Sequence, residues 1–586
     1  MSKVNYSYAQ LHENNIPEML ATGRVGSESL LAGQRQPVAS LNGKWHFMPD
    51  IYDGGLRAEW YRETGGEFEP NGPRDYDFDA APLVDVPACW NGYAAEYLLY
   101  EGSAWFFRTF SRPELSSTDR LVLRLGAANY ACMVFLNGEH VGSHVGGFTP
   151  FCIDITDHLS EQNRLHVWVS NTRRPDGVPA EFTDWHNYGG LYRDVELYRI
   201  PRVSIAEYFL YLDAEYRIRV HVRLSEKESH SVSVSVVGLG DATGTTDTDG
   251  VFESIVPGSP ELWSPDYPRL YDVVVRCGTD AAWDKIGLRR VETRGTEILL
   301  NGEPIFLRGI ALHEDHPDRF RSLNTDDRRR IIAEAKALNC NFLRLAHYPH
   351  HEEMARLADE EGILLWEEIP VYWTLQFDSR DVLENARNQL AELIRRDINR
   401  ASVILWSVGN ENPDSDARRA FMLALVRQAR TMDPTRLVTA ACLVDIAGDR
   451  ISDRLASDLD VIAVNEYYGW YYGDFDRLER LFGKRQHKPV VASEFGAAGV
   501  AGRHGSDQEH WTEEMQERVM RRQLEVIIRS GNVAGAIPWL LFDFRTPRRM
   551  NAMQGTFNRK GLLSEGLSHR KLAFRTVQQI YASLLQ

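Results

Sequence analysis

The chain has 586 residues, of which 43% are hydrophobic and 25% charged, and its 14 Trp, 24 Tyr and 24 Phe exclude a largely disordered protein. A formal net charge of −17 excludes a general nucleic-acid binder, because phosphate recognition needs a basic surface. The length suggests several domains, and the composition favours a small ligand handled locally.

The N-terminus has no apolar core segment, and no run of residues approaches the ~18 apolar residues that a membrane span requires. We therefore predict a cytoplasmic chain with no membrane segment. The six cysteines have no C-x-x-C spacing, which favours reduced, buried thiols over disulfides or metal ligands. No P-loop and no G-x-G-x-x-G after a strand are present, so the sequence indicates no cofactor and no metal.

Residues 1–200 are predicted to form a β-sandwich domain of jelly-roll type. From about residue 37, short strand-like runs are separated by turns, at residues 120–125, 130–142, 164–170 and 194–200. Asn137 and Gly138 lie where a tight hairpin would connect two strands.

Residues 201–292 are predicted to form a second, immunoglobulin-like β-sandwich. Residues 216–224 and 231–237 alternate between apolar and polar side chains, and no helical period is present. The segment has the size of a small sandwich of ~100 residues.

Residues 293–586 are predicted to form a (β/α)8 TIM barrel. Eight apolar runs, taken as eight strands, begin at residues 305, 342, 363, 403, 437, 461, 489 and 534. Helical patterns at residues 325–338 and 383–399 lie between them. The roughly 290 residues available are enough for such a barrel, and its active sites lie at the carboxyl ends of the strands.

Two glutamates follow barrel runs at such ends. Glu411 comes after the fourth run and Glu494 after the seventh. Two facing carboxyl groups can cleave a glycosidic bond, because one protonates the departing oxygen while the other attacks the anomeric carbon. A single acidic residue at a strand end is often only a cap. Two of them in one barrel, with Asn410 beside Glu411, favour the catalytic interpretation.

Several further stretches carry a family resemblance: residues 147–151 (Gly-Phe-Thr-Pro-Phe), 187–193 (Asn-Tyr-Gly-Gly-Leu-Tyr-Arg), 301–309 (Asn-Gly-Glu-Pro-Ile-Phe-Leu-Arg-Gly), 341–344 (Asn-Phe-Leu-Arg) and 347–349 (His-Tyr-Pro). With the two glutamates and the three predicted domains, the chain resembles glycoside hydrolase family 2, which holds β-galactosidases, β-mannosidases and β-glucuronidases.

The resemblance covers nearly the whole chain and implies roles for individual residues. It makes Glu411 the acid/base and Glu494 the nucleophile of a reaction that retains the anomeric configuration. Asn410 would bind the 2-hydroxyl of the sugar. Arg344 and His347 would orient the two glutamates from behind.

The sequence Asn558-Arg-Lys560 bears on the sugar. Family 2 enzymes that act on uronic acids resemble one another in an Asn-x-Lys motif shortly after the eighth strand, and the chain has it there. A lysine ammonium is a suitable counter-charge for a buried C6 carboxylate. The same spacing is also frequent in ordinary loops, where exposed lysines have no specific role.

The resemblance implies five more sugar-binding residues, each with a simpler structural alternative. Tyr467 and Tyr471 look like the tyrosines of the β-glucuronidase group, or they are packing aromatics. Asp184 matches a residue that reaches toward the sugar, or it caps a turn. His313 and Trp539 match sugar-contacting positions, or they are ordinary residues of the barrel mouth.

Two departures from the glucuronidases weaken the uronate interpretation. Glu466 and Gln554 stand where those enzymes often carry arginine, so the predicted uronate pocket is less basic. The main hypothesis is still an exo-β-glycosidase for β-uronides, above all β-D-glucuronides. The alternatives are a β-galacturonidase, a neutral-sugar β-galactosidase-type enzyme and, from another class, an inactive sugar-binding homologue.

The predicted partner is a small-molecule or oligosaccharide β-glycoside, and the family resemblance also implies a homo-oligomer, either a dimer or a tetramer.

Overall fold

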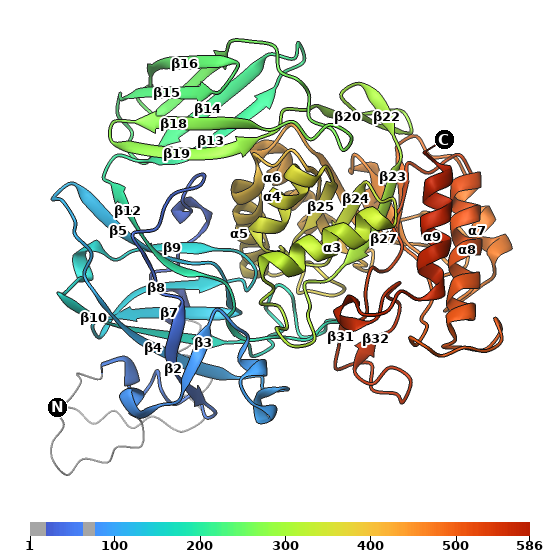
Figure 1. Ribbon diagram of the computed structural model, residues 1–586, viewed down its shortest axis with the longest axis horizontal. Helices are drawn as coiled ribbons and strands as arrows, with labels where there is room; N and C mark the ends of the chain where they lie inside the picture. Colours follow the sequence, from blue (N-terminus) through green and yellow to red (C-terminus); the bar gives the residue numbers. More distant parts are fainter. Residues whose placement is uncertain (1–18, 63–76, 586) are drawn as a thin grey trace. The chain divides into compact units, whose positions relative to one another are not determined.

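A computed structural model describes residues 19–62 and 77–585 of the chain (Figure 1). The described residues fall into two compact units. One lies within residues 1–173 and 187–206, and the other lies within residues 174–186 and 207–586. The short segment 174–186, which carries Asp184, therefore folds with the second unit.

The first unit is made of antiparallel sheets. A six-stranded sheet has the order β3-β2-β4-β10-β7-β8, a four-stranded sheet has the order β1-β12-β5-β9, and β6 pairs with β11. The strands are β1 (Ala39–Ser40), β2 (Gly43–Asp50), β3 (Leu83–Val86), β4 (Ser103–Ser111), β5 (Asp119–Leu125), β6 (Ala128–Asn129), β7 (Ala131–Leu136), β8 (Glu139–Val145), β9 (Phe151–Asp154), β10 (Gln162–Ser170), β11 (Gly190–Leu191) and β12 (Val195–Pro201).

The inner faces of these sheets share one apolar core, which includes Trp45, Phe106 and Leu123. The predicted hairpin is present between β7 and β8, where Leu136 pairs with Glu139. Asn137 and Gly138 have φ of 53° and 83°. Positive φ at both positions suits a two-residue turn that matches the twist of its strands, and Asn and Gly tolerate it best.

The second unit begins with two small antiparallel sheets of the predicted immunoglobulin-like type, with the orders β13-β14-β17 and β16-β15-β18-β19. In β14 every second side chain is buried, which the alternating sequence predicts. The strands are β13 (Ile205–Leu212), β14 (Ile218–Leu224), β15 (Ser231–Val236), β16 (Gly240–Thr245), β17 (Val251–Val256), β18 (Tyr271–Cys277) and β19 (Asp280–Ile286).

A three-stranded sheet, formed by β20 (Val291–Arg294), β21 (Glu297–Leu300) and β22 (Glu303–Ile305), leads into a closed parallel barrel of eight strands. The predicted barrel is thus confirmed. Its strands are β23 (Leu307–Leu312), β24 (Phe342–Leu345), β25 (Leu364–Glu368), β26 (Val403–Asn410), β27 (Leu437–Leu443), β28 (Ile462–Asn465), β29 (Val490–Glu494) and β30 (Gly535–Ala536).

Helices follow the barrel strands, and Figure 1 shows α7, α8 and α9 side by side. Local signals set their ends. Asn324 caps the first of them in a capping box with Asp327, and Gly362 ends the next with φ of 71°. The helices are α3 (Thr325–Ala337), α4 (Glu352–Glu361), α5 (Arg380–Asp397), α6 (Asp416–Met432), α7 (Phe475–Phe482), α8 (Glu513–Arg529) and α9 (Leu572–Ser583).

After β30 the chain forms a two-stranded hairpin, β31 (Phe544–Arg545) with β32 (Phe557–Asn558), before it reaches α9. The connection between these two strands is long, and it follows the carboxyl end of the last barrel strand. Residues of this hairpin and its loop therefore belong to the end of the barrel where Glu411 and Glu494 lie.

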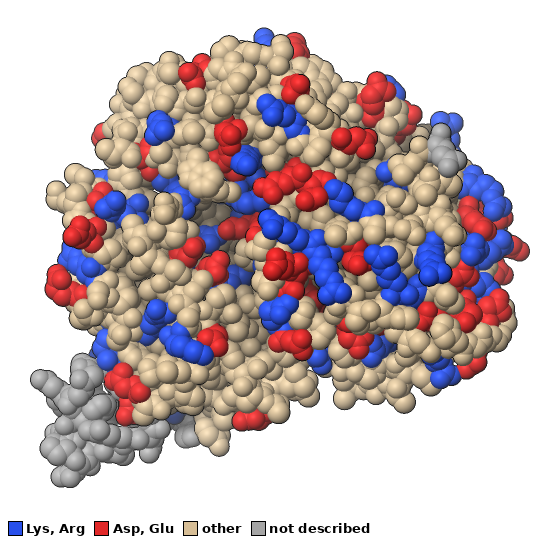
Figure 2. Space-filling model, in the orientation of Figure 1, with Lys and Arg blue, Asp and Glu red and all other residues tan. Residues whose placement is uncertain are grey.

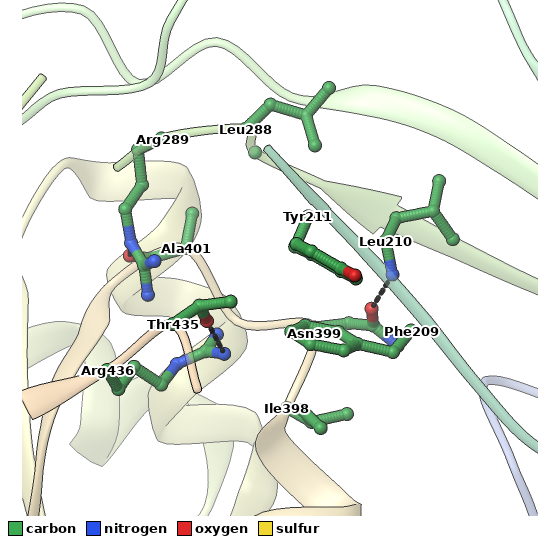
Figure 3. A pocket seen from close by; sticks show the side chains of 11 residues that line it. Phe209, Leu210, Tyr211, Leu288, Arg289, Ile398, Asn399, Ala401, Thr435 and Arg436 are labelled. Atoms are coloured by element: carbon green, nitrogen blue, oxygen red, sulfur yellow. Dashed lines mark hydrogen bonds between the residues drawn. The ribbon is translucent and has the colours of Figure 1, made fainter. Parts of the chain in front are cut away.

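A pocket of about 240 Å³ lies at the opposite end of the barrel, beside the starts of β26 and β27 (Figure 3). Arg289 enters it and donates to the carbonyl oxygens of Ala401 (3.1 Å) and Val403 (2.6 Å). Asn399 joins Leu210 in the same region through a 3.0 Å hydrogen bond. These bonds attach the immunoglobulin-like sheets to the barrel, and the pocket contains no residue of the predicted site.

Acidic and basic side chains are interspersed on the face of the molecule shown in Figure 2. The six cysteines are buried, and none of them is in a disulfide. Among the described residues, no helix combines the length and the apolar character needed to traverse a lipid bilayer.

Candidate active site

Glu494 is the last residue of β29 and is 4% exposed. Its Oε1 accepts a hydrogen bond from Arg344 Nη1 (2.8 Å), and its Oε2 accepts one from the hydroxyl of Tyr467 (2.9 Å). Burial raises the pKa of Glu494 to about 8, with the Arg344 guanidinium opposing this effect and the Glu411 carboxylate adding to it. This carboxyl group is therefore fixed in position at both oxygens.

Glu411 directly follows β26 and has φ of 51°. Trp373 Nε1 donates to its Oε2 (2.8 Å), and Asn465 Nδ2 donates to its Oε1 (3.0 Å). The pairing of β26 with β27 shifts register just before this point, as does that of β28 with β29 at Asn465. Such irregularities re-aim side chains at the end of a strand, and left-handed backbone at a non-glycine residue is typical of functional sites.

Arg344 connects Glu494 with Asn410, the neighbour of Glu411 in the chain. It is completely buried in β24, and besides Glu494 it donates to Asn410 Oδ1 (2.7 Å) and to Glu368. Because Asn410 Oδ1 also accepts from Asn465 (3.1 Å), the amide orientation of Asn410 is set. Its NH2 group then remains as the donor that can meet a substrate hydroxyl. We call Arg344, Glu368, Asn410, Glu411 and Glu494 the carboxylate cluster.

Two histidines border this cluster in neutral form. His347 Nδ1 is 2.7 Å from Glu368 Oε1, and its ring stacks on Trp539 with centroids 4.9 Å apart. His313 stacks on Phe544, with centroids 4.0 Å apart, and its buried Nε2 has no hydrogen-bond partner among the described residues. Burial lowers the pKa of both histidines well below the usual value, and nearby positive charge lowers it further.

Lys560 lies beside the two tyrosines that the sequence singles out. Its Nζ is 2.5 Å from the hydroxyl of Tyr471 and 5.1 Å from the ring centre of Tyr467. Lys560 is 2% exposed, yet within the described residues it forms no ion pair with a carboxylate. Asn558 Oδ1 accepts from the backbone N–H of Lys560 (3.2 Å), which fixes the lysine in its loop.

Asp184 is held by side chains of β32 and of the loop between β31 and β32. It accepts hydrogen bonds from Thr546 Oγ1 (3.0 Å), Arg549 Nη2 (2.5 Å) and Asn558 Nδ2 (3.5 Å). Arg549 also reaches the hydroxyl of Tyr471 (3.4 Å). We call Asp184, Tyr471, Arg549, Asn558 and Lys560 the cation pocket.

A continuous series of contacts connects the carboxylate cluster with the cation pocket. Tyr467 joins the two, since its hydroxyl contacts Glu494 and its ring is 5.2 Å from that of Tyr471. All twelve sequence-predicted site residues belong to this series: Asp184, His313, Arg344, His347, Asn410, Glu411, Tyr467, Tyr471, Glu494, Trp539, Asn558 and Lys560.

Sequence reasoning missed Trp373, Asn465, Glu368 and Arg549. Asn465 carries a signal, because it ends the sixth barrel strand as Asn410 ends the fourth. Glu368 follows Trp366 at the end of the third strand, and it also could have been found there. Trp373 and Arg549 lie in loops, where nothing in the chain alone marks them.

The two departures from the glucuronidases do not make the pocket acidic. Glu466 is buried and forms no ion pair with Lys560; its Oε2 accepts from the backbone N–H of Tyr468 (2.9 Å), and burial raises its pKa to about 8. It is therefore neutral at pH 7. Gln554 bonds to Asn551 (2.7 Å), and Arg549 supplies a guanidinium to the pocket from another position of the same loop.

The arrangement can perform acid–base and nucleophilic chemistry on a bound sugar. It has a buried carboxyl group, Glu494, and a partly buried one, Glu411, both held by hydrogen-bond donors, and a set of aromatic side chains on which a sugar ring can rest. Among the described residues, no group of three or more His, Cys, Asp or Glu side chains is arranged to hold a metal ion.

Comparison with known proteins identifies the family. Residues 291–583 match the family described as glycosyl hydrolases family 2, TIM barrel domain. Residues 38–201 match its sugar binding domain, and residues 203–289 match a third pattern of the same family. The chain belongs to glycosyl hydrolases family 2. It is thus a glycoside hydrolase, as the motifs imply.

Individual relatives of this family 2 enzyme are similar along most of their length. A β-glucuronidase of Paenibacillus borealis is 30% identical over 590 residues, which cover 90% of this chain and 94% of the relative. The structure of a Ruminococcus gnavus β-glucuronidase in complex with D-glucuronic acid is 26% identical, with a TM-score of 0.84 over 95% of this chain and 100% of the other. A family 2 β-galacturonidase from Eisenbergiella tayi, bound to galacturonate, shares the fold at 23% identity and a TM-score of 0.81.

Proposed function

We propose that this family 2 enzyme is a retaining exo-β-glycosidase that hydrolyses β-uronides, with β-D-glucuronides as its main substrates. The observation that supports a uronide is Lys560. Lys560 is 2% exposed as a residue, and its ammonium group forms no ion pair with a carboxylate of the described residues. A buried positive charge without a counter-charge is costly, and a substrate carboxylate at C6 would supply the missing partner.

The cation pocket favours a planar anion over a neutral hydroxymethyl group. Lys560 and Arg549 both contact Tyr471, and they lower its pKa although burial opposes them. Arg549 is neutralised by Asp184, whereas Lys560 is not. A carboxylate placed here would accept charge-assisted hydrogen bonds, which are about twice as strong as neutral ones.

Two steps would complete the reaction. In the first, Glu411 donates a proton to the departing oxygen while Glu494 attacks the anomeric carbon and forms a glycosyl-enzyme. In the second, Glu411 removes a proton from water, which attacks the same carbon, displaces the Glu494 carboxylate and releases the sugar with its configuration retained. Arg344 and Tyr467 hold the Glu494 carboxylate in place for attack, and the NH2 group of Asn410 meets the 2-hydroxyl.

The first step needs the proton of the site in a different place from where the free site holds it. Burial, with the Glu411 carboxylate adding to it, raises the pKa of Glu494 to about 8, so the free site holds a proton on Glu494 near neutral pH. The first step requires that proton on Glu411, with the negative charge on Glu494. Burial lowers the pKa of Arg344, but Glu368 and Glu494 raise it by more, so Arg344 stays positively charged. Its positive charge favours the negative charge on Glu494.

A panel of four p-nitrophenyl β-glycosides tests the proposal: glucuronide, galacturonide, glucoside and galactoside. We expect kcat/KM on the glucuronide to exceed that on the glucoside by roughly 100-fold or more, because a site built for a charged group rejects a ligand that lacks it. NMR of the first-formed product should show the β-anomer. A higher kcat/KM on the galactoside would overturn the uronide assignment, and binding without turnover of any substrate would indicate the sugar-binding alternative. A preference for the galacturonide would change the assigned sugar from glucuronide to galacturonide, while the role of Lys560 as counter-charge to the C6 carboxylate would stand.

Assembly into a dimer or tetramer belongs to the same proposal, since it rests on the family resemblance. Light scattering at micromolar concentration should give a multiple of the 66.9 kDa chain mass. The mass of one chain would exclude it.

A further inference from the structure

The guanidinium group of Arg548 is separated from Glu411 by one aromatic ring. The Cζ of Arg548 is 4.6 Å from the ring centre of Trp373, and Nε1 of the same indole donates to Glu411 Oε2 (2.8 Å). Arg548 is therefore one indole ring away from the carboxyl group that protonates the leaving oxygen in the proposed reaction. Any aglycone must occupy the space next to that carboxyl group.

Arg548 differs from its neighbour in the chain. Arg549 pairs with Asp184 and contacts Tyr471, so its charge is compensated. Arg548 is exposed, and over the described part of the chain its guanidinium forms neither an ion pair nor a hydrogen bond. Among the described residues its guanidinium contacts the ring of Trp373 alone, so its five N–H donors are available to a ligand.

Stacking of arginine on an aromatic ring is common and by itself indicates only packing. Two other stacked arginines of this unit, Arg436 and Arg559, also pair with a carboxylate. Arg548 keeps the ring contact and lacks the carboxylate. In a chain with a net charge of −17, an uncompensated cation beside the catalytic acid will attract anionic groups to that position.

We propose that Arg548 and Trp373 form a subsite for an aglycone that carries a carboxylate or another oxyanion next to the scissile bond. The inference rests on the proposed function and specifies its substrate class. The guanidinium would bind the oxyanion in a forked geometry, and the indole would contact the ring that bears it. The oxyanion can belong to a second uronic acid residue or to a carboxylated aryl group, which offer the same chemistry.

The test compares matched neutral and anionic aglycones. The aryl pair is p-nitrophenyl glucuronide and its analogue with a carboxylate on the phenyl ring, and the sugar pair is a glucuronide of glucose and a glucuronide of glucuronic acid. For each pair, the ratio of kcat/KM values is measured in the wild type and in Arg548→Gln, so that differences in leaving-group ability cancel. We expect the substitution to lower the anionic-to-neutral ratio by about 3- to 10-fold, as suits a partly exposed ion pair.

Three further measurements make the test decisive. Arg548→Lys keeps the charge and should retain a larger part of the preference than Arg548→Gln. Added salt should reduce the wild-type ratio. Arg485→Gln removes an equally exposed arginine from the opposite end of the barrel, before β29, and should leave the ratio unchanged.

The outcomes separate the possible explanations. A fall in the ratio for one pair only would identify the source of the oxyanion. Equal losses on neutral and anionic substrates would mean that Arg548 acts through Trp373 on Glu411, and the anion subsite would be wrong. An unchanged ratio in Arg548→Gln would also overturn it. Failure of the proposed function is distinct, because the wild type would then not hydrolyse the neutral aryl glucuronide.

Discussion

The carboxylate cluster and the cation pocket lie in one site but differ in how completely the protein satisfies them. In the carboxylate cluster both oxygens of Glu411 and both oxygens of Glu494 accept hydrogen bonds. In the cation pocket Lys560 is 2% exposed, yet among the described residues its ammonium group contacts only a hydroxyl and two aromatic rings. The hydrogen bonds of the carboxylate cluster are complete without substrate, whereas the cation pocket lacks a negative charge beside Lys560.

The difference separates catalysis from specificity. Groups that stabilise a transition state work best when they are held before the substrate arrives. A group that selects a substrate works best when its partner is missing until the correct ligand binds, because the wrong ligand then leaves a buried charge unpaired. We therefore expect changes in the carboxylate cluster to affect every substrate and changes in the cation pocket to affect uronides alone.

The largest effect is expected for Glu494→Ala. Without the nucleophile no glycosyl-enzyme can form, so kcat should fall by roughly 10³- to 10⁵-fold on uronide and neutral substrates alike. Azide should restore part of the activity and give a product of inverted configuration, which NMR of the glycosyl azide would show.

Glu466→Gln is the matched control for that experiment. Glu466 is also buried and also has a pKa raised to about 8, but its carboxyl group contacts the backbone N–H of Tyr468 rather than either catalytic glutamate. Its kcat should stay within a few-fold of the wild type. If Glu494→Ala kept more than a few per cent of kcat, the assignment of the nucleophile would be wrong.

The loss of kcat/KM in Glu411→Ala should depend on the leaving group rather than on the sugar. An activated phenolate departs without protonation, whereas an alkyl alcohol does not, so the loss in kcat/KM should be roughly 10²- to 10⁴-fold for an alkyl glucuronide. For p-nitrophenyl glucuronide the loss in kcat/KM should be much smaller. Steady-state kinetics on the two substrates measure it, and equal losses would show that Glu411 is not the general acid.

The loss of kcat/KM in Lys560→Ala should depend on the sugar rather than on the leaving group. It removes a charge-assisted contact from a buried site, so kcat/KM on the glucuronide should fall by roughly 30- to 1000-fold. Turnover of the neutral glucoside should change little or rise, because no unpaired ammonium remains in the site. Parallel losses on both sugars would make Lys560 a structural residue.

The same contrast explains what the sequence could predict. Glu411, Glu494 and Asn410 directly follow or end apolar strand runs, and a barrel brings such positions together at one end. The eight runs, and with them the fold, were therefore readable from hydrophobic pattern alone. The Asn-x-Lys motif and the tyrosines needed the family resemblance. The predicted cytoplasmic location and oligomeric state stay predictions.

Other residues could not be found this way, for physical reasons. Arg549 and Trp373 reach the site from loops, whose paths depend on contacts far away in the chain, such as the one between Arg549 and Asp184. The direction in which the Glu466 side chain points depends on how the chain leaves β28, so its identity alone suggested a less basic pocket, whereas its carboxyl group contacts the backbone of Tyr468.

The smallest effect is on stability, and it appears in the carboxylate cluster. The folded-state pKa of Glu494 is about 8, above its ordinary value of 4.5, so the folded protein binds a proton that the unfolded chain has already lost. The contribution of Glu494 to stability is then greatest below pH 4.5 and declines as the pH rises to 8.

Glutamine has the same shape as glutamic acid and does not titrate. Glu494→Gln should thus stabilise the protein by roughly 1 to 3 kcal/mol at pH 7, or about 2 to 8 °C in the Tm of the barrel. The gain should vanish near pH 4.5, whereas Glu360→Gln, which changes an exposed glutamate of α4, should leave Tm unaltered at every pH. Scanning calorimetry from pH 4.5 to 8 measures the difference, and a gain of equal size across that range would mean that Glu494 is not the group that loses its proton there.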